Sequence, residues 1–186
     1  AAFESYEFFR FFQLLQNFCV TDLSNFYLDI AKDRLYVSAP SDQRRRSCQT
    51  VMSLIIERLA GLIAPVLCHM AEDIWQNLPY QVEETSIFNR GWPTVPPEWR
   101  DPSLSEPIQR LRELRAAVNR VLEDCRSRQE LGASLEAAVR IETRKPELES
   151  ALNWLNENGD AEADGLRDWL LVSQLQLGGE PWAELL

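Results

Sequence analysis

The sequence is poor in the residues that carry most catalytic and metal-binding chemistry. Its 186 residues include a single histidine, His69, and four cysteines that never form a CxxC pair. A structural zinc site needs four closely spaced Cys or His ligands, so no metal site is predicted. His69 is interpreted as a packed helix residue rather than a catalytic base. The cysteines are expected to be small buried thiols in a reducing cytoplasm; they are Cys19, Cys48, Cys68 and Cys125.

Motifs of nucleotide and acyl-transfer chemistry are also missing. The chain has neither a glycine-rich phosphate loop nor a G-x-S-x-G nucleophile turn. The neighbouring acids Glu72–Asp73 and Glu83–Glu84 are better explained as solvated surface carboxylates than as an acid–base pair. No stretch approaches the roughly 18 apolar residues of a membrane span, and no signal-peptide pattern is present. The chain is therefore predicted to be cytoplasmic and non-catalytic by itself, with no cofactor of its own.

Lysine is rare, since 17 of the 19 basic residues are arginine. Arginine favours bidentate contacts with phosphate or carboxylate, although a high-GC genome gives the same bias and is the preferred explanation. The net charge of −10 is unevenly spread. Residues 1–60 are balanced, residues 61–145 carry −2 and residues 146–186 carry −8. The overall acidity therefore does not exclude a nucleic-acid partner for the N-terminal region.

The first half of the chain reads as helices joined by short turns. Apolar residues at three- and four-residue steps between Phe8 and Ile30 predict one long helix, which ends with Lys32, Arg34 and Tyr36 before a break at Ser38–Asp42. Ser41 or Asp42 is expected to cap a second helix that reaches about Leu62, and Pro65 to begin a third. The buried face of the third helix is expected to hold Val66, Met70, Ile74 and Trp75.

A Pro- and Trp-rich strap at about residues 80–106 is then expected to cross the helices. Apolar spacing predicts a fourth long helix from Ile108 to about Arg128, which completes an antiparallel bundle. After it the pattern changes to a short strand at 137–143, a helix at 146–158, a helix at 165–170 and a strand at 172–177. The predicted fold is mainly α: a helical bundle over residues 1–130, followed by a small α/β subdomain over residues 131–186.

The strongest candidate binding surface lies where the first helix ends and the second begins. Its basic and aromatic residues are Lys32, Arg34, Tyr36, Arg44, Arg45 and Arg46. Cations at a helix N-terminus oppose the helix dipole, so local stability does not explain the three arginines, and a negatively charged ligand is favoured. A solvated surface, with pairing to Asp29 or Asp33, is the alternative. Tyr36 and Trp92 offer rings on which bases could stack, or are core or lid residues.

Five segments carry a resemblance to a known family. They are Asn25–Tyr36 (NFYLDIAKDRLY), Arg45–Thr50 (RRSCQT), Leu62–Leu67 with Ala71–Trp75 (LIAPVL and AEDIW), and Leu131–Val139 (LGASLEAAV). Together they resemble the anticodon-binding helical domain of isoleucyl-tRNA synthetases, which are class I enzymes, in bacterial and most closely cyanobacterial or plastid form. The LIAPVL and AEDIW segments are shared with the valine and leucine enzymes, whose equivalent domain is an alternative.

The resemblance implies a domain that binds the anticodon stem-loop of tRNA(Ile), contacting neither DNA nor membrane. It implies a parent synthetase that uses ATP and magnesium, with its catalytic core outside this chain. The core's His-Ile-Gly-His and Lys-Met-Ser-Lys-Ser signatures are absent here, as is the cysteine-rich zinc module of many bacterial members. The chain also lacks an initiator methionine and reads as a piece of a longer protein.

A different class of function is a protein- or domain-docking module in the acidic C-terminal segment. Trp154 and Trp169 would be its hydrophobic anchors, or would instead fill the core of the small subdomain. The acids that disfavour RNA there are Asp160, Glu162, Asp164 and Asp168. A stand-alone relative repurposed for another RNA is a third possibility.

Overall fold

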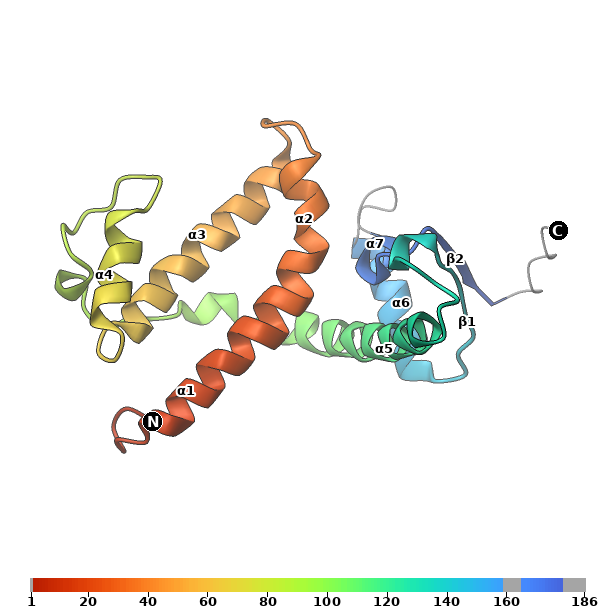
Figure 1. Cartoon of the computed structure of the whole chain (residues 1–186), viewed down its shortest axis with the longest axis horizontal. Helices are drawn as coiled ribbons and strands as arrows, with labels where there is room; N and C mark the ends of the chain where they lie inside the picture. The colour runs from red at the N-terminus through yellow and green to blue at the C-terminus, as the bar shows by residue number, and fades with distance from the viewer. Residues whose placement is uncertain (1, 159–164, 179–186) are drawn as a thin grey trace. The chain divides into compact units, whose positions relative to one another are not determined.

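The computed structural model describes residues 2–158 and 165–178 of the chain. Backbone contacts divide it into two compact units, residues 1–99 and residues 100–186. Each unit is described by itself. The fold is mainly helical with one small sheet, as predicted (Figure 1).

The first unit begins with one continuous helical run (Figure 1). Its parts are α1 (Phe8–Asn17), the π-helical segment η1 (Phe18–Leu28) and α2 (Asp29–Tyr36). No proline or glycine interrupts these residues, so nothing in the backbone chemistry breaks the run. The predicted long helix is confirmed, and α2 ends at Tyr36, just before the predicted break at Ser38–Asp42.

The chain reverses after Val37 and returns as α3 (Gln43–Ile63). Of the two candidate caps, Asp42 is the one used, because its Oδ1 accepts hydrogen bonds from the backbone N–H groups of Arg44 at 2.8 Å and Arg45 at 3.0 Å. The negative charge of this carboxylate also interacts favourably with the positive end of the helix dipole. This stabilisation partly offsets the unfavourable effect of the arginines that follow.

The prediction that Pro65 begins the third helix is wrong, because α4 covers Cys68–Gln76. The backbone N–H groups of Val66 and Leu67 both return to the carbonyl oxygen of Ile63, so Pro65 lies in the turn that follows α3. The predicted buried face is only partly correct. Ala71 and Trp75 point into the core four residues apart, which turns Met70 outward; Met70 is 55% exposed and Val66 41%.

The same rotation of α4 decides the exposure of its first two residues. His69 and Cys68 lie on the exposed side of α4, so the interpretation of His69 as a packed residue is wrong. Cys48 is buried as expected, whereas Cys19 and Cys125 are half-buried, and all four thiols are free.

The strap packs on α4 through specific hydrogen bonds. The indole Nε1 of Trp75 donates to the carbonyl oxygen of Glu84 at 2.9 Å. The carboxylate of Glu72 accepts from Ser86 Oγ at 2.8 Å and from the backbone N–H of Ile87 at 3.1 Å. Two single-turn 3-10 helices, η2 (Ile87–Asn89) and η3 (Pro97–Trp99), order the rest. The core of the unit consists of Ala60, Ile63, Ala64, Ala71, Trp75 and Ile87.

The predicted end of the strap at residue 106 is wrong, because α5 (Pro102–Ser127) begins earlier. Asp101 caps α5 by accepting from the backbone N–H of Ser103 at 2.9 Å, and Pro102 occupies the first turn, where a missing N–H costs nothing. Pro107 is accommodated inside the helix. Backbone contacts group α5 with the C-terminal elements, whereas the domain boundary at residues 130/131 stays a prediction.

The second unit contains the expected strand, helix, helix and strand. They are β1 (Ala138–Ile141), α6 (Pro146–Asn158), α7 (Leu166–Leu170) and β2 (Gln174–Leu177), preceded by the 3-10 turn η4 (Ser134–Glu136). The two strands pair in parallel, from Ala138 opposite Gln174 to Ile141 opposite Leu177. The predicted Asn158–Asp160 loop falls largely outside the described residues. A parallel pair requires a crossover, and α6 and α7 lie within it.

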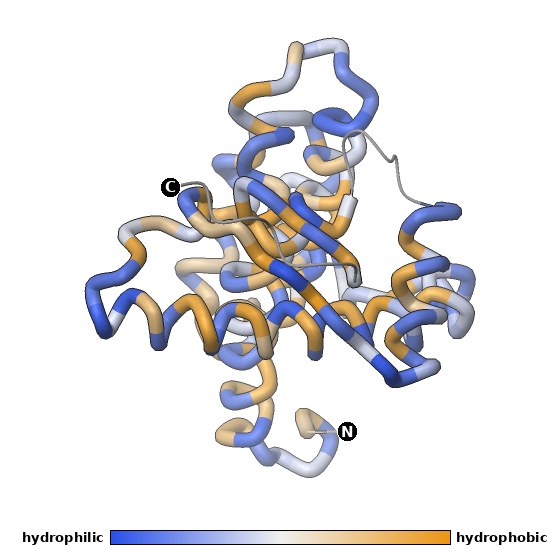
Figure 2. The backbone as a smooth tube through the Cα atoms, turned by 90° about the vertical axis from the view of Figure 1, so that its right-hand side faces the viewer, coloured by the Kyte–Doolittle hydropathy of each residue, from blue (hydrophilic) through white to orange (hydrophobic). Residues whose placement is uncertain are grey.

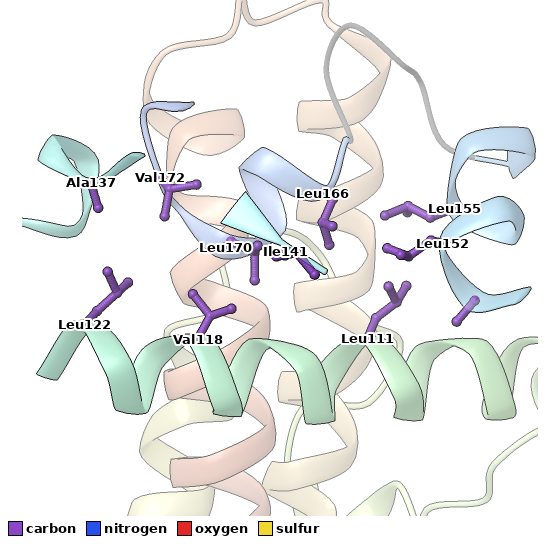
Figure 3. Packing of buried hydrophobic residues seen from close by; sticks show 11 residues of the cluster. Leu111, Val118, Leu122, Ala137, Ile141, Leu152, Leu155, Leu166, Leu170 and Val172 are labelled. Atoms are coloured by element: carbon purple, nitrogen blue, oxygen red, sulfur yellow. The ribbon is translucent and has the colours of Figure 1, made fainter. Parts of the chain in front are cut away.

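The core of the second unit is rich in leucines from its helices and also includes Ile141 of β1 (Figure 3). Leu111, Val118 and Leu122 project from one side of α5 toward Leu152 of α6 and Leu170 of α7. Along the backbone hydrophobic residues recur between hydrophilic ones, as elements with one buried side require (Figure 2). No helix in the described part of the chain is long and apolar enough to cross a membrane. The same residues form no cluster of three or more potential metal ligands.

Candidate nucleic-acid interface

The tip of the α2–α3 hairpin, residues 29–46, gathers most of the predicted contact residues (Figure 1). We call this segment the hairpin tip. It holds five basic and three acidic side chains, a net charge of +2 within a chain whose total is −10. Positive charge is therefore concentrated where α2 ends and α3 begins, and the direct chain turn between the two helices keeps these charges together.

The three consecutive arginines have different surroundings. Arg45 is half-buried, and its Nη1 donates to the carbonyl oxygen of Ser38 at 2.8 Å, which ties α3 to the turn before it. Arg44 is also half-buried, whereas Arg46 is exposed. Because helical side chains diverge by about 100° per residue, three in a row cannot share one environment. Arg46 is thus the member of the trio best placed to meet a ligand from solvent.

Lys32 and Arg34 also differ. Lys32 Nζ lies 3.0 Å from Asp29 Oδ1, and its side chain is 48% exposed, so this pair contributes at most about 1 kcal/mol. Arg34 is half-buried near Tyr27. Burial, together with the neighbouring Cys48 thiol, raises the pKa of Tyr27 to about 12, and the positive charge of Arg34 opposes that rise.

Tyr36 presents its ring almost fully to solvent. It is the last residue of α2 and is 86% exposed, followed by Val37 at 81%. The alternative that Tyr36 fills the core is excluded by this exposure. An aromatic ring presented to solvent beside several cations is the combination that single-stranded RNA uses for stacking and phosphate contact.

Trp92 is not brought to the hairpin tip. Its ring packs edge-on against Phe3, with centroids 5.1 Å apart and planes at 75°. Phe3 precedes α1, and the helical run from Phe8 to Tyr36 spans roughly 40 Å at about 1.5 Å per residue. Trp92 is 54% exposed, so its predicted contact with RNA stays a prediction, separate from the other six residues.

A groove beside the hairpin tip was missed by sequence reasoning. It has a volume of about 720 Å³ and lies between η1, the end of α2, the middle of α3 and the start of the strap at Tyr80. Gln49, Met52, Ser53 and Ile56 line one side of it at three- and four-residue spacing. That spacing is visible in the sequence, but it reads equally well as the buried face of a helix.

Another groove, of about 740 Å³, lies between α1 and α3. Its lining is apolar except for Arg58, whose guanidinium stacks over the ring of Trp99 at 4.4 Å. With its one cation already held against an aromatic face, this groove offers little to a phosphate chain.

The features proposed for a C-terminal docking module are engaged elsewhere or lie outside the described residues. Trp154 and Trp169 both pack against the leucine core of the second unit, which supports their role as core residues. Of the four acids, Asp168 is described and lies 3.7 Å from Arg167. Asp160, Glu162 and Asp164 lie outside the described residues.

The fold and this surface define a helical domain with a cationic, aromatic hairpin tip. The family described as the anticodon-binding domain of tRNA ligase matches residues 1–141. The chain belongs to this family, as the resemblance in its sequence predicted.

Similar proteins agree on one enzyme name. The chain is 84% identical over 185 residues to an isoleucine–tRNA ligase of Parasynechococcus marenigrum and 77% identical to that of a Synechococcus strain. It is 75% identical to the isoleucine–tRNA ligase of Prochlorococcus marinus strain MIT 9313. Each match covers 100% of this chain and 19% of the relative, so the chain spans about a fifth of their length. The predicted cyanobacterial resemblance is confirmed.

Proposed function

We propose that this chain binds the anticodon stem-loop of tRNA(Ile) and positions that tRNA for aminoacylation by a catalytic core elsewhere in a longer isoleucine–tRNA ligase. The family description and the names of the cyanobacterial relatives support this assignment. The parent enzyme would act in the cytoplasm and use ATP and magnesium in its catalytic core.

The observation that carries the proposal is the grouping of five cations and one exposed ring at the hairpin tip. Phosphate contacts fix the register and orientation of an RNA, while contacts with unstacked bases supply sequence information. Arginine suits the first task because its planar guanidinium contacts phosphate in bidentate fashion. Tyr36 suits the second because its ring is 86% exposed at the edge of the cluster.

The surroundings of the cations suggest an order of importance. Arg46 is exposed and meets phosphate first. Lys32 must loosen its 3.0 Å contact with Asp29 before it can do the same. Arg45 holds the carbonyl oxygen of Ser38, so its main contribution is to the shape of the turn that presents the others. Arg34 and Arg44, both half-buried, strengthen the positive field from within.

The test is a triple substitution of Arg44, Arg45 and Arg46 by alanine in the intact synthetase. We expect a higher KM for tRNA with unchanged ATP-dependent activation of isoleucine, because activation needs no tRNA contact by this surface. A control triple variant replaces Arg120, Arg128 and Arg167, which are exposed residues of the second unit. It removes the same number of positive charges from the other unit.

The salt dependence of binding gives a second readout. The slope of log affinity against log salt is expected to flatten by about 0.7 to 0.9 for each phosphate that the variant no longer neutralises. An unchanged KM and slope in the hairpin variant, or equal losses in the control variant, would reject the proposed surface. Binding of tRNA(Ile) but not of a transcript with an altered anticodon would place recognition at the anticodon itself.

A further inference from the structure

The groove beside the hairpin tip is continuous with the cationic surface along α3. On α3, Gln49 follows Arg45 and Arg46 by four and three residues. Met52 and Ser53 in turn follow Gln49 by three and four residues. Residues at these spacings follow one another down a single helix face. A chain of phosphates held at the start of α3 would therefore lie next to the mouth of the groove.

The lining of the groove combines apolar surface with a few polar groups. Most of the lining is apolar, and Tyr36 lines the groove at the end of α2. The aliphatic residues are Leu23 and Leu28 of η1, Leu35 of α2, and Met52, Ile55, Ile56 and Leu59 of α3. Polar atoms come from the Gln49 amide and from the Tyr80 hydroxyl, which lies 3.4 Å from the carbonyl oxygen of Ser53. Tyr80 is 37% exposed, so its ring edge remains accessible.

A nucleobase matches this lining. Its two faces are apolar and stack on aromatic or aliphatic side chains, while its edge donates and accepts hydrogen bonds. The volume of about 720 Å³ falls within the usual range of small-molecule pockets and exceeds what a single base needs. The adjoining net charge of +2 favours a base that is attached to a phosphate chain over an apolar protein segment.

We propose that this groove holds one unpaired base of the bound RNA, with Tyr36 stacking at its mouth and Gln49 and Tyr80 facing the base edge. The proposal rests on the proposed function, since it names where a loop nucleotide enters once the hairpin tip holds the neighbouring phosphates. It adds Gln49, Met52 and Tyr80 to the residues that contact RNA.

The experiment uses the intact synthetase and tRNA(Ile) anticodon stem-loops in which each loop nucleotide is made abasic in turn. An abasic site keeps its phosphate, so it removes base contacts without changing the phosphates present. We expect one position at which the wild-type enzyme loses affinity by about five- to one-hundred-fold, the range for removal of one stacked base.

Two variants then test whether that base lies in the groove. Met52→Trp fills the groove, and Tyr36→Ala removes the ring at its mouth; the second alters a residue that is 86% exposed and so leaves the core intact. Each variant should bind the unmodified stem-loop more weakly, and the abasic substitution at the sensitive position should then weaken binding by less than about twofold, because coupled interactions cannot be removed twice. Val37→Ala, 81% exposed beside Tyr36, is the matched control and should keep the full abasic penalty.

The outcomes separate this proposal from the proposed function. If the triple arginine variant weakens binding while abasic penalties stay the same in Met52→Trp and Tyr36→Ala, the groove proposal fails alone. If the triple arginine variant binds as the wild type does, the proposed function fails as well. Met52→Trp could instead lower the melting temperature or isoleucine activation without changing RNA affinity. In that case the groove is occupied by another part of the synthetase, and the proposal is overturned.

Discussion

Arg45 and Ser38 are joined across the hairpin turn, with Arg45 Nη1 donating to the carbonyl oxygen of Ser38 at 2.8 Å. This bond gives one arginine of the trio a structural task. It fastens the start of α3 to the turn that follows α2, and so holds Tyr36 and Arg46 on either side of the same turn. The three consecutive arginines therefore have different roles, and that of Arg45 is structural.

Replacing Arg45 by alanine should lower the free energy of unfolding by about 1 kcal/mol, because the variant lacks a partly buried hydrogen bond to a backbone carbonyl. Urea unfolding monitored by circular dichroism measures this change. Arg46→Ala is the matched control; it removes an exposed side chain and should change stability by less than about 0.5 kcal/mol. Equal effects of the two substitutions would contradict the structural role of Arg45.

Removing the cap of α3 should be costly as well. Asp42→Ala leaves the N–H groups of Arg44 and Arg45 without their carboxylate acceptor, and we expect a decrease of about 0.5 to 2 kcal/mol in unfolding free energy. Asp42→Asn keeps a capping oxygen and should retain most of the stability. If the alanine and asparagine variants were equally unstable in urea unfolding, the charge of Asp42 rather than its cap would be responsible.

Stability should depend on pH through Glu72. Hydrogen bonds from Gln76 first, then from Ser86 and the N–H of Ile87, hold the pKa of this carboxyl below its usual 4.5 against the opposing effect of burial. A lowered folded pKa means that the stabilisation is present above about pH 4.5 and is lost as pH falls through the lower folded value. The strap should therefore loosen from α4 in acid.

The measurement compares the melting temperature between neutral pH and about pH 3 in the wild type and in Glu72→Gln. The variant should melt lower at neutral pH and show a smaller drop in acid, since its side chain does not titrate. Glu83→Gln, at an exposed strap position, is the control and should follow the wild type. An acid-induced drop of the same size in both variants would exclude Glu72 as its source.

Close packing of the strap on α3 can be tested at Gly61. A Cβ atom there would lie 3.2 Å from Cδ and Cγ of Pro93, whose ring is rigid and buried. Gly61→Val should therefore destabilise the protein by about 1 to 3 kcal/mol, the usual cost of overpacking. Adding Pro93→Ala should restore part of that stability in denaturant unfolding. If the double variant is no more stable than Gly61→Val, the clash with Pro93 is not the cause.

Local signals account for the elements that were predicted well. Asp42 and Asp101 each lie directly before a helix and accept backbone hydrogen bonds within three residues. Strand β1 and helix α6 likewise lie within the predicted ranges. The misplaced elements involve proline: Pro65 lies in a turn although it suited a helix start, and Pro102 begins a helix although it was counted in the strap. Proline fits both settings, and distant packing chooses between them.

The sequence by itself determined which segments are helical or extended, apart from where α4 and α5 begin, and it determined the family and the segment in which the cations cluster. These depend on apolar spacing, caps and exact residue identities over a few neighbouring positions. Only the tertiary structure decided that Arg45 donates a hydrogen bond to Ser38 and that the Tyr36 side chain is exposed. It also decided that Trp92 packs against Phe3 and that a groove lies beside the hairpin tip. The reason is physical: exposure and cavity shape depend on contacts between residues far apart in the chain, which no local pattern encodes.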